Sequence, residues 1–460
     1  MNILEGPKTP PIVQLIQWIA DPIGFMESNA KLYGDIFQTQ LGSKFSLVLI
    51  GDPKALQEIF RANAKQCDAD VGIANESLPI VVGKNSILLT NSQRHKRKRK
   101  LLMPPFHGSR MVAYGELICH ITQQIVSQWQ IGQPFSVRSS TQVITMRVIL
   151  QAVFGLYEGL RSWQLQQALE EWLNITASPI KSSPLYLRFL QQDWGAWSPW
   201  GHFLRCRQRV DDLLYTEIRE RRENLDPTRT DILTLLMSAE DENGERMTDE
   251  ELRDELITLL LAGHESTATS LAWALYWIHK LPDVKKKLRT ELSSLGDRPN
   301  PEAIFRLPYL TAVCQETLRI YPVTPIAYSR VPTSSMEIGD YQFDAGTMLT
   351  PCIYLTHHRE DLYPNPKKFR PERFLERQYS PYEYLPFGGG NRRCIGMALA
   401  QYEMKLAIST ILQNLELALP DDRPVRPVRR GLTIAPSDNL RLVVTGRRTP
   451  NKTPAAATVG

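Results

Sequence analysis

The stretch Phe387-Gly388-Gly389-Gly390-Asn391-Arg392-Arg393-Cys394-Ile395-Gly396 decides how this chain is interpreted, and a predicted helix, MALAQYEMKLAISTILQ, follows it directly. Three consecutive glycines allow positive φ and let the backbone approach a flat ligand closely. Cys394 then sits at a helix N-terminus, where free N–H groups and the helix dipole favour a thiolate over a thiol. A glycine-rich turn with a buried cysteine is one alternative. A phosphate-binding loop is a weaker one, because no Gly-Lys-Ser/Thr follows.

The same residues match the pattern FxxGxRxCxG one for one and so resemble the haem-binding signature of the cytochrome P-450 family. The resemblance implies heme b (iron protoporphyrin IX, below called haem) as the cofactor and Cys394 as the metal ligand. A thiolate pushes electron density onto the iron, as cleavage of an O–O bond requires. Phe387 would shield the sulfur, Arg392 would pair with a haem propionate, and Gly396 completes the signature.

Two further motifs stand in the order that the family has. Glu316-Thr317-Leu318-Arg319 matches its ExxR helix, and Pro371-Glu372-Arg373-Phe374 resembles its PERF segment. Glu and Arg three positions apart share one face of a helix. The resemblance implies a buried charge network of Glu316, Arg319 and Arg373 that braces the proximal side of the haem.

A basic run, HKRKRK over residues 95–100, resembles the family's C-helix. His95 and Arg99, four residues apart, occupy positions that usually contact a haem propionate, and Arg330 resembles a third propionate partner. The lysines of the run would help to dock an acidic electron donor. The alternatives are a nucleic-acid or localisation patch and a solvated helix face.

The segment AGHEST over residues 262–267 lies inside the longest apolar helical run, Leu252–Lys280. A glycine and a glutamate inside a core helix both cost stability and therefore suggest a functional site. The segment resembles the family's oxygen-activating AGxET/DT motif, whose glycine can open the helix for dioxygen. Glu265, Ser266 and Thr267 are the catalytic candidates, with a hydroxyl linked to Glu265 as the proton relay. The family's usual threonine falls on Ser266, and Thr267 follows one place later, so either hydroxyl could be the relay. The hydroxyl of Ser266 can bond back to the carbonyl of Ala262.

The composition is that of an ordinary globular protein: 42% of the 460 residues are hydrophobic and 22% are charged. A net charge of +5 is modest for this size and gives no reason to expect nucleic acid as a partner. The six cysteines include no CxxC pair, and their spacing suggests neither a zinc site nor a disulfide framework. Reduced thiols in the cytosol fit this pattern.

The two ends of the chain differ in character. Near the start, IVQLIQWIA (12–20) is too short to span a bilayer and has no signal-peptide flanks, although its amphipathic character would permit loose contact with a membrane surface. At the other end, RRTPNKTPAAATVG (447–460) has the composition of a disordered tail. We therefore expect one domain over residues 1–446.

Between the two ends, periodicity predicts a fold that is mainly α with a small β region. A helix is predicted over residues 21–34, a hairpin around Gly42–Ser43, helices from about 94 to 320, and strand-like pieces after Pro322. The resemblance covers nearly the whole chain and implies the cytochrome P-450 fold. In that triangular helical body, haem would lie between a distal I-type helix over Leu252–Lys280 and the proximal L-type helix after Cys394.

The function implied is that of a haem-dependent monooxygenase that uses dioxygen and external electrons to hydroxylate a lipophilic substrate. No flavin or nicotinamide fingerprint occurs in the sequence, so we expect a separate ferredoxin and ferredoxin reductase as electron donors. Family members that resemble this sequence in the AGHE segment and the PFGGGxRxCxG loop often act on fatty acids, retinoids or other lipophilic molecules. The resemblance therefore implies a long-chain fatty acid or similar lipid as the substrate, and the stretches assigned to the pocket wall are accordingly apolar. They are 77–87, 179–190, 258–266, 323–327 and 432–434. A cytoplasmic monomer without a transmembrane anchor is expected.

Other functions stay open at this point. The substrate could instead be a terpenoid or a polyketide. The same haem could drive peroxide-dependent or rearrangement chemistry, against which Glu265 and Ser266 speak, since rearranging members tend to lose this acid–alcohol pair. A non-catalytic haem sensor would leave the lipophilic pocket and the proton-relay segment unexplained.

Overall fold

The structure is a computed structural model that describes residues 4–42, 45–62, 66–70, 77–108, 110–155, 159–177, 185, 190–195, 197–224, 226, 228–296 and 299–448. It is 56% helical with a small β region, so the predicted fold class is confirmed. The longer helices are α1 (Pro11–Ala20), α2 (Pro22–Tyr33), α3 (Pro53–Arg61), α5 (Ser92–Leu102), α6 (Arg110–Ser127), α7 (Val137–Phe154), α8 (Leu160–Ala177), α10 (Pro199–Glu223), α12 (Asp249–Lys280), α13 (Pro282–Ser293), α15 (Pro308–Ile320) and α18 (Met397–Asn414). The shorter ones are α4 (Leu78–Val82), α11 (Ile232–Ser238), α14 (Pro301–Phe305), α16 (Ile353–His357) and α17 (Arg373–Glu376).

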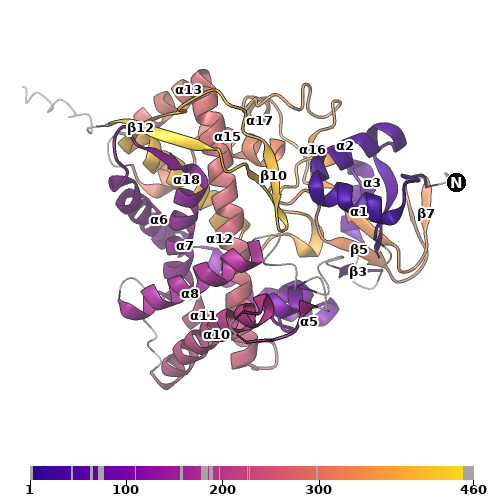
Figure 1. Ribbon diagram of the computed structural model, residues 1–460, viewed down its shortest axis with the longest axis horizontal. Coiled ribbons are helices and arrows are strands. Elements are labelled where there is room, and N and C mark those ends of the chain that lie inside the picture. Colours follow the sequence, from indigo (N-terminus) through magenta and orange to yellow (C-terminus); the bar gives the residue numbers. More distant parts are fainter. Residues whose placement is uncertain are drawn as a thin grey trace, which may run out of the picture.

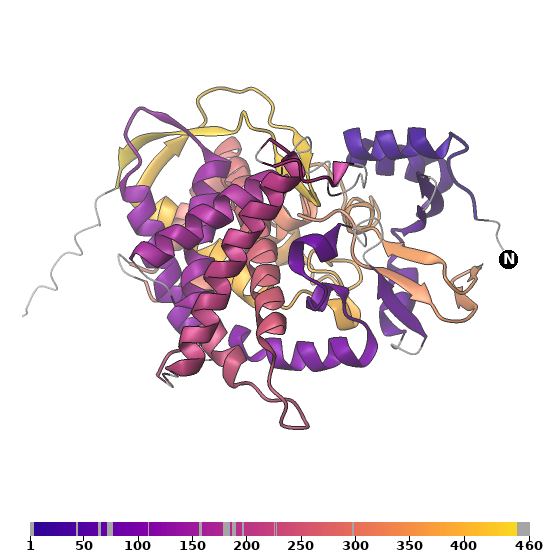
Figure 2. The ribbon, with the colours of Figure 1, turned by 60° about the horizontal axis from the view of Figure 1, so that its bottom comes forward.

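The helix α12 is the axis of the helical body, and it packs against α7, α10, α15 and α18. Figure 1 shows it running through the centre of that body, and Figure 2 shows α5 as a separate helix below it. It starts with a capping box, in which Thr248 accepts from the backbone of Glu251 and the Glu251 side chain accepts in return. The sequence placed its start three residues late, at Leu252, because the capping residues are polar. Its end, just before Pro282, was predicted correctly.

In the described part of the chain, a five-stranded sheet of order β1-β2-β8-β5-β3 joins strands from both ends of the sequence. The predicted hairpin is confirmed in the antiparallel pair β1 and β2, with Ile36 opposite Ile50, although residues 43–44 of its turn lie outside the described residues. Beside it, β2 pairs in parallel with β8, which brings residues 348–351 next to residues 47–50. The strands of this sheet are β1 (Ile36–Leu41), β2 (Phe45–Ile50), β8 (Met348–Pro351), β5 (Ser329–Pro332) and β3 (Cys67–Asp70).

Three smaller sheets complete the β structure. One has the order β4-β12-β9, and the others are hairpins, β6-β7 and β10-β11. The last strand, β12, runs to Arg447, which pairs with Leu415, so this first residue of the predicted tail belongs to the sheet. Residues 449–460 of that tail lie outside the described residues. The strands are β4 (Pro134–Ser136), β12 (Arg441–Arg447), β9 (Leu415–Ala418), β6 (Met336–Ile338), β7 (Tyr341–Phe343), β10 (Pro427–Arg430) and β11 (Thr433–Pro436).

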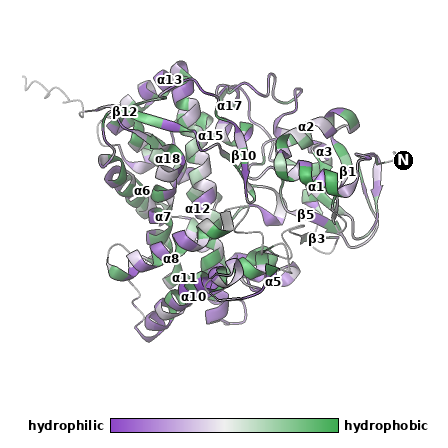
Figure 3. Cartoon of the chain, in the orientation of Figure 1, coloured by the Kyte–Doolittle hydropathy of each residue, from purple (hydrophilic) through white to green (hydrophobic). Residues whose placement is uncertain are grey.

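Hydropathy follows this arrangement. Hydrophilic residues cover outer helices such as α10 and α13 (Figure 3), while the main hydrophobic core gathers around α12. The first helix, α1, is amphipathic as predicted: Trp18 is buried, whereas Ile12, Ile16 and Ile19 are exposed. Among the described residues, no helix is both long enough and apolar enough to span a bilayer.

Candidate active site

The loop that precedes α18 is held in shape by its glycines. Gly388 and Gly390 adopt φ of 67° and 64°, in the left-handed region that side chains with a Cβ avoid. Between them, Gly389 is required by space, because a Cβ at that position would lie 2.5 Å from the ring of Phe60. The glycine run therefore fixes the position of Cys394.

Cys394 lies just before α18, whose first residue is Met397 and whose N-cap is Gly396. Its N–H donates to the carbonyl of Phe387 at 2.9 Å. Burial raises the pKa of its thiol, while the N–H groups of Gly396 and Met397 and the guanidinium of Arg99 act in the opposite direction. Burial is the largest of these effects on the pKa, while the helix N-terminus acts toward the thiolate, in the direction expected from the sequence. A coordinated metal ion deprotonates a thiol outright.

Cys394 keeps a face that no described side chain covers. The residue keeps exposed surface, yet its thiol is desolvated by the protein around it. Similarly, Ala262 is exposed in the middle of α12, although Leu260 and His264 on either side are buried. The described side chains therefore leave part of the Cys394 loop and of the middle of α12 uncovered. The open faces of α12 and of the Cys394 loop are where a flat cofactor would fit.

On α12, Ser266 and Thr267 have different surroundings. The hydroxyl of Ser266 donates to the carbonyl of Ala262 at 2.5 Å, as the sequence suggested. Ala262 and Ser266 lie one turn apart, and Ser266 is partly exposed beside the exposed Ala262. Thr267, one residue later, is 3% exposed. The side chain that borders the open strip of α12 is therefore that of Ser266.

Gly263 has a packing role in addition to the one expected. The helix is continuous over Asp249–Lys280, and an opening for dioxygen at this residue stays a prediction. A Cβ on Gly263 would lie 3.1 Å from the side chain of Ile149 in α7. The glycine thus lets α7 and α12 pack closely.

Glu265 points to α7 and not to Ser266. One of its carboxylate oxygens accepts from Arg138 at 2.7 Å and the other from Gln142 at 2.9 Å. The hydroxyl of Ser266 is engaged with Ala262. The link expected between Glu265 and the relay hydroxyl is therefore not a direct hydrogen bond to Ser266 in this structure. The sequence carried no sign of this pairing, since Arg138 lies 127 residues earlier.

Four basic side chains converge beside the Cys394 loop. Burial lowers the pKa of His95 to about 4, assisted by the nearby charges of Arg392, Arg99 and Arg330. Burial also lowers the pKa of Arg330 and of Arg392 to about 10 each. A positive cluster inside a protein is costly unless an anion accompanies it.

The partners of these arginines are carbonyl oxygens. Arg99 donates to the carbonyl of Arg393 at 2.7 Å, and Arg330 donates to that of Gly389 at 3.1 Å. Arg392 donates to the carbonyl of Ile87 at 3.1 Å. No described carboxylate lies within 4.0 Å of any member of the cluster. The two propionates of a haem fit this uncompensated charge, so the residues present fit the cofactor that the sequence implied.

The comparison with known families decides which family the site belongs to. The model of the family described as "Cytochrome P450" matches residues 4–442. The chain belongs to this family. The cytochrome P-450 fold predicted from the sequence is confirmed, and the protein is a monooxygenase with heme b as its cofactor.

Curated relatives and solved structures agree with this assignment. The "Putative cytochrome P450 135B1" of Mycobacterium tuberculosis is 34% identical over 467 residues, which cover 100% of this chain and 95% of the relative. The "Putative cytochrome P450 137" of the same organism is 32% identical over 416 residues, 89% of this chain and 83% of that one. The structure titled "Retinoic acid bound cyanobacterial CYP120A1" is 25% identical with a TM-score of 0.84, over 97% of this chain and 100% of that chain. A cytochrome P450DA heme domain gives the same identity and TM-score over 97% and 98%.

In this P-450, the three residues of the predicted charge network lie together and are buried. Arg319 holds Glu316 with two hydrogen bonds of 2.7 and 2.9 Å, and Arg373 reaches the same carboxylate at 3.1 Å. Glu316 also accepts from the N–H of Arg370 at 2.8 Å. Both guanidiniums lie over the ring of Tyr363. The network joins α15 to the segment around α17.

The basic run in α5 of this P-450 is split between interior and surface. Lys98 is 1% exposed, and its ammonium lies 3.0 Å from Glu255 and 3.5 Å from Glu251. Burial raises the pKa of Glu255 to about 7, although Lys98 acts to lower it. Including Lys98 in a docking surface was therefore wrong, because this lysine anchors α5 to α12. Lys96 and Lys100 are exposed.

Proposed function

We propose that this P-450 hydroxylates a long-chain fatty acid or a similar lipid. The observation that carries the proposal is the likeness, over 97% of this chain, to a structure whose title says that it binds retinoic acid, a lipophilic carboxylic acid. The open strip of α12 supports it, because Leu259 and Ala262, which lie on the same face of the helix as Ser266, keep accessible surface and are apolar. Of the stretches assigned to the pocket wall, residues 179–184 and 186–189 lie outside the described residues.

In this proposal Cys394 would ligate the haem iron, Arg99, Arg330 and Arg392 would neutralise the propionates, and His95 would contact a propionate beside them. Haem, when bound, supplies the activation of dioxygen and the insertion of one oxygen atom into the substrate. Ser266 provides a hydroxyl at the open strip of α12, able to hold and pass a proton. Its hydrogen bond to the carbonyl of Ala262 orients that hydroxyl.

Replacing Ser266 with alanine tests the proton relay. We expect Ser266→Ala to bind haem and substrate normally and to accept electrons, since the side chain is small and partly exposed. Product formed per NADPH consumed should fall by roughly 100-fold, the lower end of what a positioned proton donor contributes, and peroxide should rise in its place. Ser266→Thr should remain coupled because it keeps the hydroxyl.

Thr267→Ala is the matched control, because residues one apart on a helix point in directions about a hundred degrees apart. It should leave the coupling unchanged. If Thr267→Ala uncouples the reaction and Ser266→Ala does not, the relay is Thr267. If neither variant uncouples it, neither hydroxyl is the relay.

A substrate screen tests the lipid proposal directly. Binding of a substrate near the haem shifts the Soret band, so fatty acids of graded length should give saturable shifts, followed by hydroxylated products. A terpenoid is the second candidate, favoured by the same observation because retinoic acid is built from isoprene units. Tight binding of terpenoids with no response to fatty acids would replace the first substrate class by the second.

The electron donor is proposed to be a separate acidic ferredoxin served by its reductase. Lys96 is exposed and has no described carboxylate within 4.0 Å, so it is free to meet a partner. We expect Lys96→Glu to slow reduction by the ferredoxin several-fold at low salt, and rising salt to slow the unmodified protein as well. Stopped-flow reduction measures both effects.

Lys31→Glu, which reverses the charge of an exposed lysine on α2, should leave the reduction rate unchanged. Equal slowing by Lys96→Glu and Lys31→Glu would point to net charge alone and contradict a docking role for α5. We further propose a cytoplasmic monomer, with residues 1–446 as one domain, which cell fractionation, gel filtration and limited proteolysis can test.

A further inference from the structure

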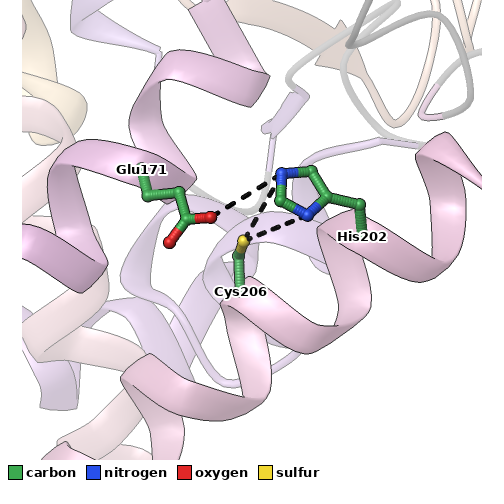
Figure 4. Close-up of side chains that lie close together, drawn as sticks. All are labelled: Glu171, His202 and Cys206. Carbon is green, nitrogen blue, oxygen red and sulfur yellow. Dashed lines mark hydrogen bonds and ion pairs between the residues drawn. The ribbon is translucent and has the colours of Figure 1, made fainter. Parts of the chain in front are cut away.

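Three side chains with metal-binding atoms meet where α8 packs against α10. His202 and Cys206 lie four residues apart on α10, and Glu171 faces them from α8 (Figure 4). The ring nitrogen Nε2 of His202 lies 3.8 Å from a carboxylate oxygen of Glu171. The Cys206 sulfur lies 3.8 Å from both ring nitrogens. Among the described residues this is the group whose ligand atoms all lie within 4.8 Å of one another.

These separations are close to those of a zinc site. Zinc bonds of about 2.0–2.1 Å to nitrogen or oxygen and about 2.3 Å to sulfur, in tetrahedral geometry, place ligand atoms about 3.3–3.6 Å apart. The observed 3.8 Å contacts exceed this by a few tenths of an ångström, which small side-chain rotations can supply. A thiol and an imidazole at 3.8 Å form at most a weak hydrogen bond, so the contact itself does little to hold this arrangement.

An ion can enter this site from solvent, and a neighbouring side chain orients one of the three ligands. The side chains of Glu171 and His202 are 41% and 47% exposed, whereas Cys206 is buried. Water can therefore reach the site as a fourth ligand. Arg209 donates to one carboxylate oxygen of Glu171 at 2.8 Å, which leaves the other oxygen facing His202. Outer partners of this kind are typical of metal-binding carboxylates.

We propose that Glu171, His202 and Cys206 bind a divalent cation of the zinc class, with water completing the coordination. Sulfur and imidazole ligands favour zinc over magnesium or calcium, which prefer oxygen alone. The bound ion would tie α8 to α10, and the ligands must lose their protons, so binding releases protons to the buffer. Nothing in this site depends on the substrate of the P-450.

Zinc chloride is the probe, added to chelator-treated, haem-loaded protein, in which haem iron occupies Cys394. Calorimetry should give one zinc ion per chain with a dissociation constant in the micromolar range or below, whereas magnesium chloride should give no binding. X-ray absorption at the zinc edge, which iron does not obscure, should show one sulfur ligand at about 2.3 Å. Thermal melting should shift upward with zinc.

Matched variants decide which residues are responsible. Cys206→Ser and His202→Ala should each weaken zinc binding by at least roughly 100-fold. Loss of an outer partner of a metal ligand costs up to about this much, and loss of the ligand itself should cost no less. A double control, Cys119→Ser with His120→Ala on α6, should bind zinc as the unmodified protein does. The Soret spectrum and the melting temperature without zinc establish that each variant is folded.

Equal zinc binding by Cys206→Ser and the unmodified protein would overturn the proposal, since the ion would then sit on surface histidines. An absorption edge without a sulfur ligand would overturn it as well, as would the absence of binding. These outcomes leave the proposed hydroxylation untouched, because no substrate, electron donor or turnover enters the measurement.

Discussion

In the Cys394→Ser variant, the red-shifted Soret band of the reduced, CO-bound haem is expected to disappear. The band arises from thiolate ligation, and a serine hydroxyl in the same place is far less acidic than a thiol and cannot supply that ligand. The backbone of the loop should stay as it is, because its closing hydrogen bond to Phe387 uses the N–H of residue 394 and not its side chain. Hydroxylation should be lost together with the band. Difference spectra of the reduced protein with and without CO measure the change.

Cys119→Ser is the control, since Cys119 is a partly buried cysteine on α6 outside the loop. It should keep the red-shifted band in full. If Cys394→Ser retained the band, the ligand would have to be another residue, and the assignment of the whole loop would fail with it.

Glu316→Ala should reduce the free energy of unfolding by about 3–5 kcal/mol, because it leaves two buried guanidiniums without their carboxylate. Glu316, Arg319 and Arg373 are 0%, 0% and 2% exposed, so water cannot replace the lost partner. A loss of this size is comparable to the whole stability of some domains. We therefore expect haem loss or failure to fold. Urea unfolding followed by circular dichroism and haem absorbance gives the value.

The control is Glu302→Ala on α14. Glu302 and Arg306 form an exposed pair at 3.5 Å, and pairs of this kind contribute at most about 1 kcal/mol. If Glu316→Ala kept full haem occupancy and an unchanged free energy of unfolding, the network would not stabilise the proximal side of the haem site. Similar losses in both variants would point to a general effect of removing a carboxylate.

The features that the sequence predicted correctly are those set by residues close together along the chain. The glycines before Cys394 act on their own backbone, and α12 ends where Pro282 removes an N–H, so both features are local. Glu316 and Arg319 share a helix face by spacing alone. Arg373 was assigned through the family resemblance, because its distance along the chain carries no geometric information.

The errors concern directions in which side chains point. A run of six basic residues gives no sign that Lys98 points into the protein. Its direction depends on its hydrogen bond to Glu255, which lies 157 residues later in the chain. Glu265 turns to Arg138 for a similar reason. The spacing of the cysteines along the chain could not indicate the group of Glu171, His202 and Cys206, because only one member of the group is a cysteine. The group that the structure brings together mixes three residue types from two helices.

The close packing of α7 and α12 also determines where this enzyme can be altered. Ala262 and Gly263 are adjacent, yet a larger residue at 262 would extend toward the space proposed for haem and substrate, whereas the Cβ of one at 263 would meet Ile149 at 3.1 Å. Overpacking of that kind costs about 1–3 kcal/mol. A mutant library aimed at new substrates should therefore randomise position 262 and keep glycine at 263. Members of such a library should keep the close contact between α7 and α12, because the residue that determines it is left unchanged.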